Sequence, residues 1–115
     1  MHYLYLSTCN TCRRILEELG GADRFTLQDV KTEPITPEQL DQLHQLTGSY
    51  EALFNRRSRQ YRTRGLHEQD LTEADYRRLI LEEYTFIKRP IVFTDAHAYI
   101  GNSKKVVAAA KAAVG

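Results

Sequence analysis

The chain has 115 residues, of which 42% are hydrophobic and 27% charged, with a formal net charge of +1. This composition is typical of one folded domain and argues against a disordered chain, a collagen, a coiled coil or a polycation built for nucleic acid. No apolar run approaches the roughly 18 residues of a membrane span, and the first residues lack the pattern of a secretion signal, so we expect a cytoplasmic protein with no membrane partner.

The first part of the sequence predicts a β-α-β unit. The apolar, aromatic run over residues 3–6 is typical of a buried strand. From Asn10 the apolar period becomes helical, and Gly20 and Gly21 end the predicted helix. Alternation over residues 25–29 predicts a second strand, which the helical crossover makes parallel to the first.

The middle of the chain, from about residue 36 to about residue 86, predicts an all-helical insertion. Thr36, Pro37 and Gln39 form a capping-box pattern that starts one helix. A short helix is expected near Ser49, and a further helix after Thr72 whose buried face extends to Tyr84.

The last third predicts two strands and a helix. Residues 91–93 and 98–100 form an expected pair of strands around a turn, and the alanine-rich segment that follows favours a helix. The order is therefore β-α-β, helical insertion, β-β-α, within a single α/β domain over residues 1–115. This is the order of the thioredoxin-like fold.

Cys9 and Cys12 stand where the first strand turns into the first helix, and this position favours redox chemistry. Unpaired backbone N–H groups and the helix dipole stabilise a thiolate there, which is the reactive form of cysteine. Cys12 shares the apolar helix face and is expected to be buried, whereas Cys9 precedes the helix and is expected to be more exposed. The pattern predicts Cys9 as nucleophile and Cys12 as resolving thiol. The alternative is that both are inert residues at a helix start.

Two arginines follow this motif, and no metal site is expected. Arg13 and Arg14 oppose the helix dipole, a cost that a nearby thiolate or bound oxyanion would offset; the alternative is pairing with Glu17 and Glu18. A structural zinc site needs four ligands, but the chain has no other cysteine, and its four histidines lack ligand spacing.

Three separated segments resemble the ArsC/Spx family. They are Leu6-Ser7-Thr8-Cys9-Asn10-Thr11-Cys12-Arg13, Ala52-Leu53-Phe54-Asn55-Arg56-Arg57-Ser58 and Arg89-Pro90-Ile91-Val92. The family includes glutaredoxin-coupled arsenate reductases, Spx transcriptional regulators and YffB-type proteins. The resemblance covers nearly the whole chain and implies a thioredoxin-like fold.

The resemblance also implies roles for individual residues. Cys9 matches the nucleophile of the reductases, and Arg13, Arg57 and Arg89 match family arginines that bind the anion. Pro90 matches a proline that is typically cis and faces the reactive cysteine. The reductases carry an arginine where this chain has Asn55, and a further one near Gly101.

These observations predict a thiol oxidoreductase that resembles a glutaredoxin-coupled arsenate reductase. No cofactor is expected to be bound; glutathione is the implied co-substrate, glutaredoxin an implied partner, and an oxyanion or glutathione-type molecule the substrate. The alternative is an Spx-like, redox-switched regulator that binds the C-terminal domain of the RNA polymerase α-subunit. The arginines of residues 56–64 favour a solvated or anion-binding surface over direct contact with nucleic acid.

Overall fold

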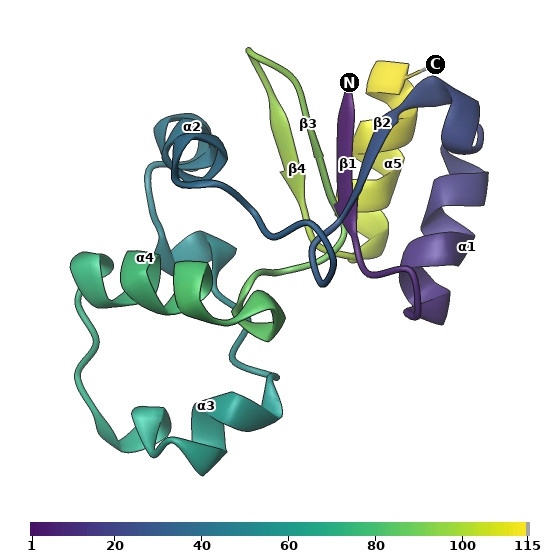
Figure 1. Cartoon of the computed structure of the whole chain (residues 1–115). Coiled ribbons are helices and arrows are strands. Elements are labelled where there is room, and N and C mark those ends of the chain that lie inside the picture. The colour runs from purple at the N-terminus through teal and green to yellow at the C-terminus, as the bar shows by residue number, and fades with distance from the viewer. Residues whose placement is uncertain (115) are drawn as a thin grey trace. The chain divides into compact units, whose positions relative to one another are not determined.

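The computed structural model describes residues 1–114, whose contacts divide the chain into two compact units. One unit contains Met1–Glu33 and the segment from Arg89 onward, and the other is Pro34–Lys88. The second unit contains the helical insertion that the sequence predicts (Figure 1). None of the helices in the described part of the chain is both long and apolar enough to span a bilayer.

A four-stranded sheet forms the centre of the first unit. Its strands are β1 (His2–Tyr5), β2 (Thr26–Asp29), β3 (Ile91–Phe93) and β4 (Ala98–Ile100). The spatial order is β2-β1-β3-β4. As predicted, β1 and β2 are parallel and β3 and β4 antiparallel, and β1 also pairs with β3 in the antiparallel sense.

Helices α1 (Asn10–Glu18) and α5 (Lys104–Val114) cover one face of this sheet. The alternation of side chains along β1 and β3 places Tyr3 and Val92 on that face. There they join Ile15 of α1 and Ala110 of α5 in one buried cluster. The 3.6-residue apolar period of α1 therefore fixes which side of the helix faces the sheet and which side carries its polar residues.

The second unit consists of helices joined by short turns. Its helices are α2 (Pro37–Thr47), α3 (Arg59–Thr63) and α4 (Glu73–Glu82), with 3-10 turns η2 (Glu51–Leu53), η3 (Leu66–Glu68) and η4 (Tyr84–Phe86). Thr36 and Thr72 each start a helix with a complete capping box. Gly48 ends α2 with a φ of +79°, a conformation that favours glycine.

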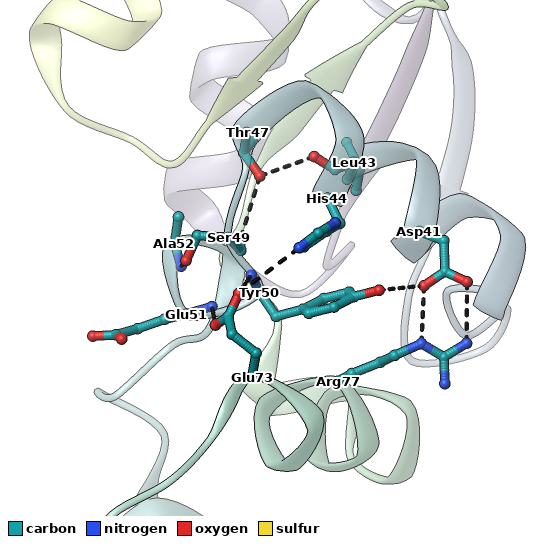
Figure 2. Close-up of polar contacts among 10 residues, drawn as sticks. All are labelled: Asp41, Leu43, His44, Thr47, Ser49, Tyr50, Glu51, Ala52, Glu73 and Arg77. Atoms are coloured by element: carbon teal, nitrogen blue, oxygen red, sulfur yellow. Dashed lines mark hydrogen bonds and ion pairs between the residues drawn. The ribbon is translucent and has the colours of Figure 1, made fainter.

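A polar network ties α2 to α4 inside the second unit (Figure 2). Both oxygens of Asp41 accept hydrogen bonds from the Arg77 guanidinium, at 2.9 and 3.1 Å, and one of them also accepts from the Tyr50 hydroxyl at 2.6 Å. These bonds lower the pKa of Asp41 to about 2. The Tyr50 ring stacks on His44 with centroids 4.1 Å apart, and Glu73 accepts the backbone N–H of Tyr50 at 2.8 Å.

The sequence predictions are wrong in two local details. The short helix expected near Ser49 is present as the single 3-10 turn η2 (Glu51–Leu53), but Phe54 lies outside it because the backbone becomes extended there. Tyr84 does not continue the buried face of α4: that helix ends at Glu82, and Tyr84 is half-buried in η4.

Candidate active site

The two cysteines occupy different positions within the first turn of α1. Cys9 is the N-cap, and its Sγ accepts a hydrogen bond from the Cys12 backbone N–H at 3.4 Å. Serine or aspartate at an N-cap uses its side-chain oxygen in the same way, so the sulfur substitutes for that oxygen. Cys12 is 1% exposed, whereas Cys9 is half-buried, and both are free thiols. The predicted difference in burial is therefore confirmed.

This arrangement separates the acidities of the two thiols. Burial acts to raise the pKa of Cys9, but hydrogen bonds from the backbone and side chain of Cys12 outweigh it. The backbone of Thr11 and the positive charge of Arg89 add to this effect, and the pKa of Cys9 lies below that of an ordinary cysteine. Burial raises the pKa of Cys12 to about 11. Cys9 is therefore the more acidic of the two thiols, and Cys12 keeps its proton at neutral pH.

Arg89 and Pro90 lie in the same unit as the two cysteines, directly before β3. The Arg89–Pro90 peptide bond is cis, which confirms the expectation from the resemblance. Pro90 is buried, and its carbonyl accepts the backbone N–H of Gly101 at 2.8 Å. The charge of Arg89 favours the thiolate form of both Cys9 and Cys12.

The other two predicted anion-binding arginines differ in their surroundings. Arg13 is exposed in the first turn of α1, and within residues 1–114 it forms no ion pair with Glu17. Arg57 is exposed in the second unit, just before α3, and its backbone N–H donates to Asn55 at 3.1 Å. The structure thus groups Cys9, Cys12, Arg13 and Arg89 in one unit and assigns Arg57 to the other.

Other arginines of residues 56–64 have partners in the helical unit. Arg56 donates to Glu51 at 2.7 Å and to the Tyr76 hydroxyl at 3.0 Å. Arg64 lies 3.6 Å from Glu82 and stacks over the Phe86 ring. These two side chains make contacts within the helical unit, so the structure supports a structural role for them rather than anion binding.

Sequence reasoning missed a buried hydroxyl that supports the cysteine loop. Tyr3 is completely buried on β1, and its hydroxyl donates a 2.6 Å hydrogen bond to the Cys12 carbonyl. Its burial and the nearby sulfurs raise the pKa of Tyr3, so the phenol remains a proton donor in this bond. The strand pattern indicated that Tyr3 is a core residue, but no pattern in the sequence shows where its hydroxyl points.

A second unpredicted contact holds the loop that leads to Cys9. Ser7, which follows β1, donates a hydrogen bond to the carboxylate of Asp29 at the end of β2. This bond lowers the pKa of Asp29, and a further bond from the Lys31 backbone adds to the effect. The two residues come together because Tyr5 and Asp29 are paired at the ends of the parallel strands. Among residues 1–114, no group of three or more His, Cys, Asp or Glu side chains is placed to hold a metal ion.

Comparison with known proteins connects this site to a family. The YffB protein has a structure similar to this chain, with a TM-score of 0.75, 26% sequence identity, and 94% of this chain and 96% of that chain covered. An ArsC-related protein from Brucella melitensis has a TM-score of 0.68 at 25% identity, over 95% of this chain and 93% of its own.

The arsenate reductase from Vibrio cholerae shares the fold, with a TM-score of 0.75 at 21% identity and 94% of each chain covered. These neighbours agree with the predicted thioredoxin-like architecture. No curated protein sequence matches the chain. The sequence profile of the ArsC family matches residues 4–110, a span that includes both cysteines, the helical insertion and the Arg89–Pro90 segment, and the chain therefore belongs to the ArsC family.

Proposed function

We propose that this chain is a thiol oxidoreductase in which Cys9 is the nucleophile and Cys12 the resolving thiol. The observation that carries the proposal is the placement of the two thiols in one helical turn: the Cys9 sulfur caps α1 and accepts from the Cys12 N–H at 3.4 Å, whereas Cys12 is buried. The cap contact lowers the pKa of Cys9 and so favours its attacking thiolate form, and a buried, protonated neighbour does not compete for the substrate.

The proposed substrate is an oxyanion such as arsenate, as in the reductases of the family. The Cys9 thiolate attacks arsenic and a hydroxide leaves, which forms a sulfur–arsenic bond. Cys12 gives its proton to the released hydroxide, which becomes water, and its sulfur then attacks the Cys9 sulfur. The electron pair of the sulfur–arsenic bond passes to arsenic, and trivalent arsenic leaves. The two thiols have together lost two electrons and form a disulfide. Two molecules of glutathione, with glutaredoxin as catalyst, restore the thiols.

Arginine is suited to binding the oxyanion in this scheme, because its planar fork matches two oxygen atoms. Arg89 has the strongest support, since its charge already favours the Cys9 thiolate. Arg13 is exposed one position beyond Cys12 on α1. The case for Arg57 is its match to the Spx and YffB pattern, and Pro90 has a structural role at the start of β3.

Turnover of arsenate with glutathione and glutaredoxin tests the proposal. We expect Cys9→Ser to abolish turnover, whereas Cys12→Ser blocks the intramolecular disulfide but leaves the first attack intact. Iodoacetamide near neutral pH, followed by peptide mapping, should modify Cys9 first. Full turnover in Cys9→Ser, or modification of Cys12 before Cys9, would contradict these roles.

An Spx-like regulator is the second candidate, because a Cys-x-x-Cys pair with one buried thiol also suits a redox switch. This function requires binding to the C-terminal domain of the RNA polymerase α-subunit that depends on the Cys9–Cys12 oxidation state. A pull-down on that domain with oxidised and with reduced chain separates the candidates. Binding in one redox state without arsenate turnover supports the regulator.

A further inference from the structure

A groove of about 490 Å³ lies between α1 and α5, on the unit that contains the sheet. Its apolar lining comes from the buried Ile15, the half-buried Val107 and Ala108. Both helices pack on the same face of the sheet through the cluster that contains Ile15 and Ala110. The groove thus lies between the two helices, and its lining residues Ile15 and Val107 also belong to the packing against the sheet.

Positive charge surrounds this apolar lining. Arg14 of α1 and Lys104 and Lys111 of α5 line the groove, against the single carboxylate of Glu18. Arg14 and Glu18 are four positions apart on α1, yet no ion pair forms between them. Within residues 1–114, none of these four charged side chains is in an ion pair, so three cations and one carboxylate give the groove an excess of positive charge.

An apolar centre with a charged rim is the anatomy of a protein interface. Uncompensated lysine and arginine around such a centre attract carboxylates and speed the encounter with an acidic partner. We propose that the groove docks a partner protein through a segment in which an apolar side chain is flanked by Asp or Glu. The apolar side chain contacts Val107 and Ala108 above the buried Ile15, and the carboxylates face Arg14, Lys104 and Lys111.

The groove is close enough to Cys9 for one partner to cover both. Ile15 is six positions after Cys9, which corresponds to about 9 Å along the helix axis. A standard interface buries about 800 Å² on each partner, a patch roughly 30 Å across. A disulfide of the docked partner is therefore within reach of the Cys9 thiolate, which attacks one of its sulfurs, forms a mixed disulfide and releases the other sulfur as a thiolate. This step rests on the proposed function, whereas docking itself does not.

A synthetic peptide with Leu and Phe between flanking Asp and Glu residues provides the probe. Its terminal cysteine is activated as a 2-pyridyl disulfide; attack by the Cys9 thiolate forms a Cys9–peptide disulfide and releases pyridine-2-thione, whose absorbance reports the rate. We expect this peptide to react about tenfold faster at low ionic strength than its lysine-flanked counterpart, with the advantage shrinking as salt screens the charges.

The chain offers matched variants for this comparison. Lys104→Glu with Lys111→Glu reverses two charges in the groove and should remove the advantage. Lys105→Glu with Lys31→Glu makes the same change in net charge at exposed positions outside the groove and should keep it. Docking in the groove is overturned if both double variants lose the rate advantage of the acidic peptide equally. It is also overturned if an acidic peptide without Leu and Phe reacts equally fast. Either result would mean that the chain attracts anions in general.

Two further measurements separate docking from thiol chemistry. The small probe 2-hydroxyethyl 2-pyridyl disulfide reports the intrinsic reactivity of Cys9, which neither double variant should change. If the small probe does not react, the proposed function fails. In that case docking is still tested by fluorescence anisotropy of the acidic peptide, with fluorescein in place of the activated cysteine. If Lys104→Glu with Lys111→Glu leaves the affinity for this peptide unchanged, docking in the groove is refuted.

Discussion

Removal of the Tyr3 hydroxyl tests whether the core of the sheet controls the reactivity of Cys9. In Tyr3→Phe the ring keeps its packing, but the Cys12 carbonyl loses the 2.6 Å bond from the phenol. A neutral hydrogen bond contributes about 0.5–1.5 kcal/mol net, and this one is fully buried, so we expect about 1 kcal/mol of destabilisation. For a chain of this size, that corresponds to a fall in Tm of about 3–5 °C.

The same substitution should raise the pKa of Cys9. The Tyr3 bond holds the backbone of Cys12, whose N–H donates to Cys9 Sγ at 3.4 Å, and a looser turn weakens stabilisation of the thiolate. The rate of iodoacetamide alkylation across pH reports this pKa, and urea unfolding reports stability.

The matched control for this experiment is Tyr5→Phe. It removes a hydroxyl from the same strand that makes no hydrogen bond to the residues described. We expect its alkylation profile and its stability to remain close to those of the wild type. If Tyr3→Phe loses stability while its alkylation profile coincides with that of the wild type, Tyr3 is a core residue only and does not act on Cys9.

Three further experiments test individual titratable or charged groups. Arg89→Ala should raise the pKa of Cys9 and Arg89→Lys should largely preserve it, as read from the alkylation profile; an unmoved profile in Arg89→Ala places Arg89 outside the site. The pKa of Cys12 is raised from 9.0 to about 11, so its contribution to the free energy of unfolding is complete below pH 9 and is lost as pH rises towards 11. In urea unfolding, Cys12→Ala should not show this loss of stability between pH 9 and 11. The pKa of Asp41 is lowered to about 2 by Arg77, so its contribution to the free energy of unfolding is present above pH 4 and disappears as pH falls towards 2. Asp41→Asn should flatten this part of the acid unfolding profile. A profile identical to that of the wild type would show that the ion pair is not stabilising.

The sequence predicted the parts of the fold that depend on local periodicity and on chain direction. The helical period from Asn10 and the capping box at Thr36 are local signals, and both elements appear where expected. The parallel pairing of β1 and β2 follows from the helical crossover between them. The burial of Cys12 followed from the same helical period, because it shares a face with Ile15.

The contacts that sequence reasoning missed depend on long-range register. Ser7 and Asp29 are 22 positions apart, and their bond requires both the pairing of the strands and the conformation of the loop after β1. The Tyr3 hydroxyl reaches the Cys12 carbonyl only because the packing of α1 on the sheet brings the first turn of the helix next to Tyr3. The short helix expected near Ser49 is a single 3-10 turn, and a segment of that length has no periodic signal from which its end could be predicted.

The cap geometry of Cys9 links thiol acidity to the redox poise of the pair. In the reduced chain the Cys9 sulfur is an N-cap that accepts from the third residue of α1, and this contact and the Arg89 charge both favour its anionic form. Formation of a Cys9–Cys12 disulfide removes the negative charge, so the stabilisation by the helix dipole and by Arg89 exists only in the reduced form. A reduced form stabilised in this way makes the disulfide the stronger oxidant. Any substitution that raises the pKa of Cys9 by weakening these contacts should therefore also make the disulfide harder to reduce, and the two quantities should change together across Tyr3→Phe and Arg89→Ala.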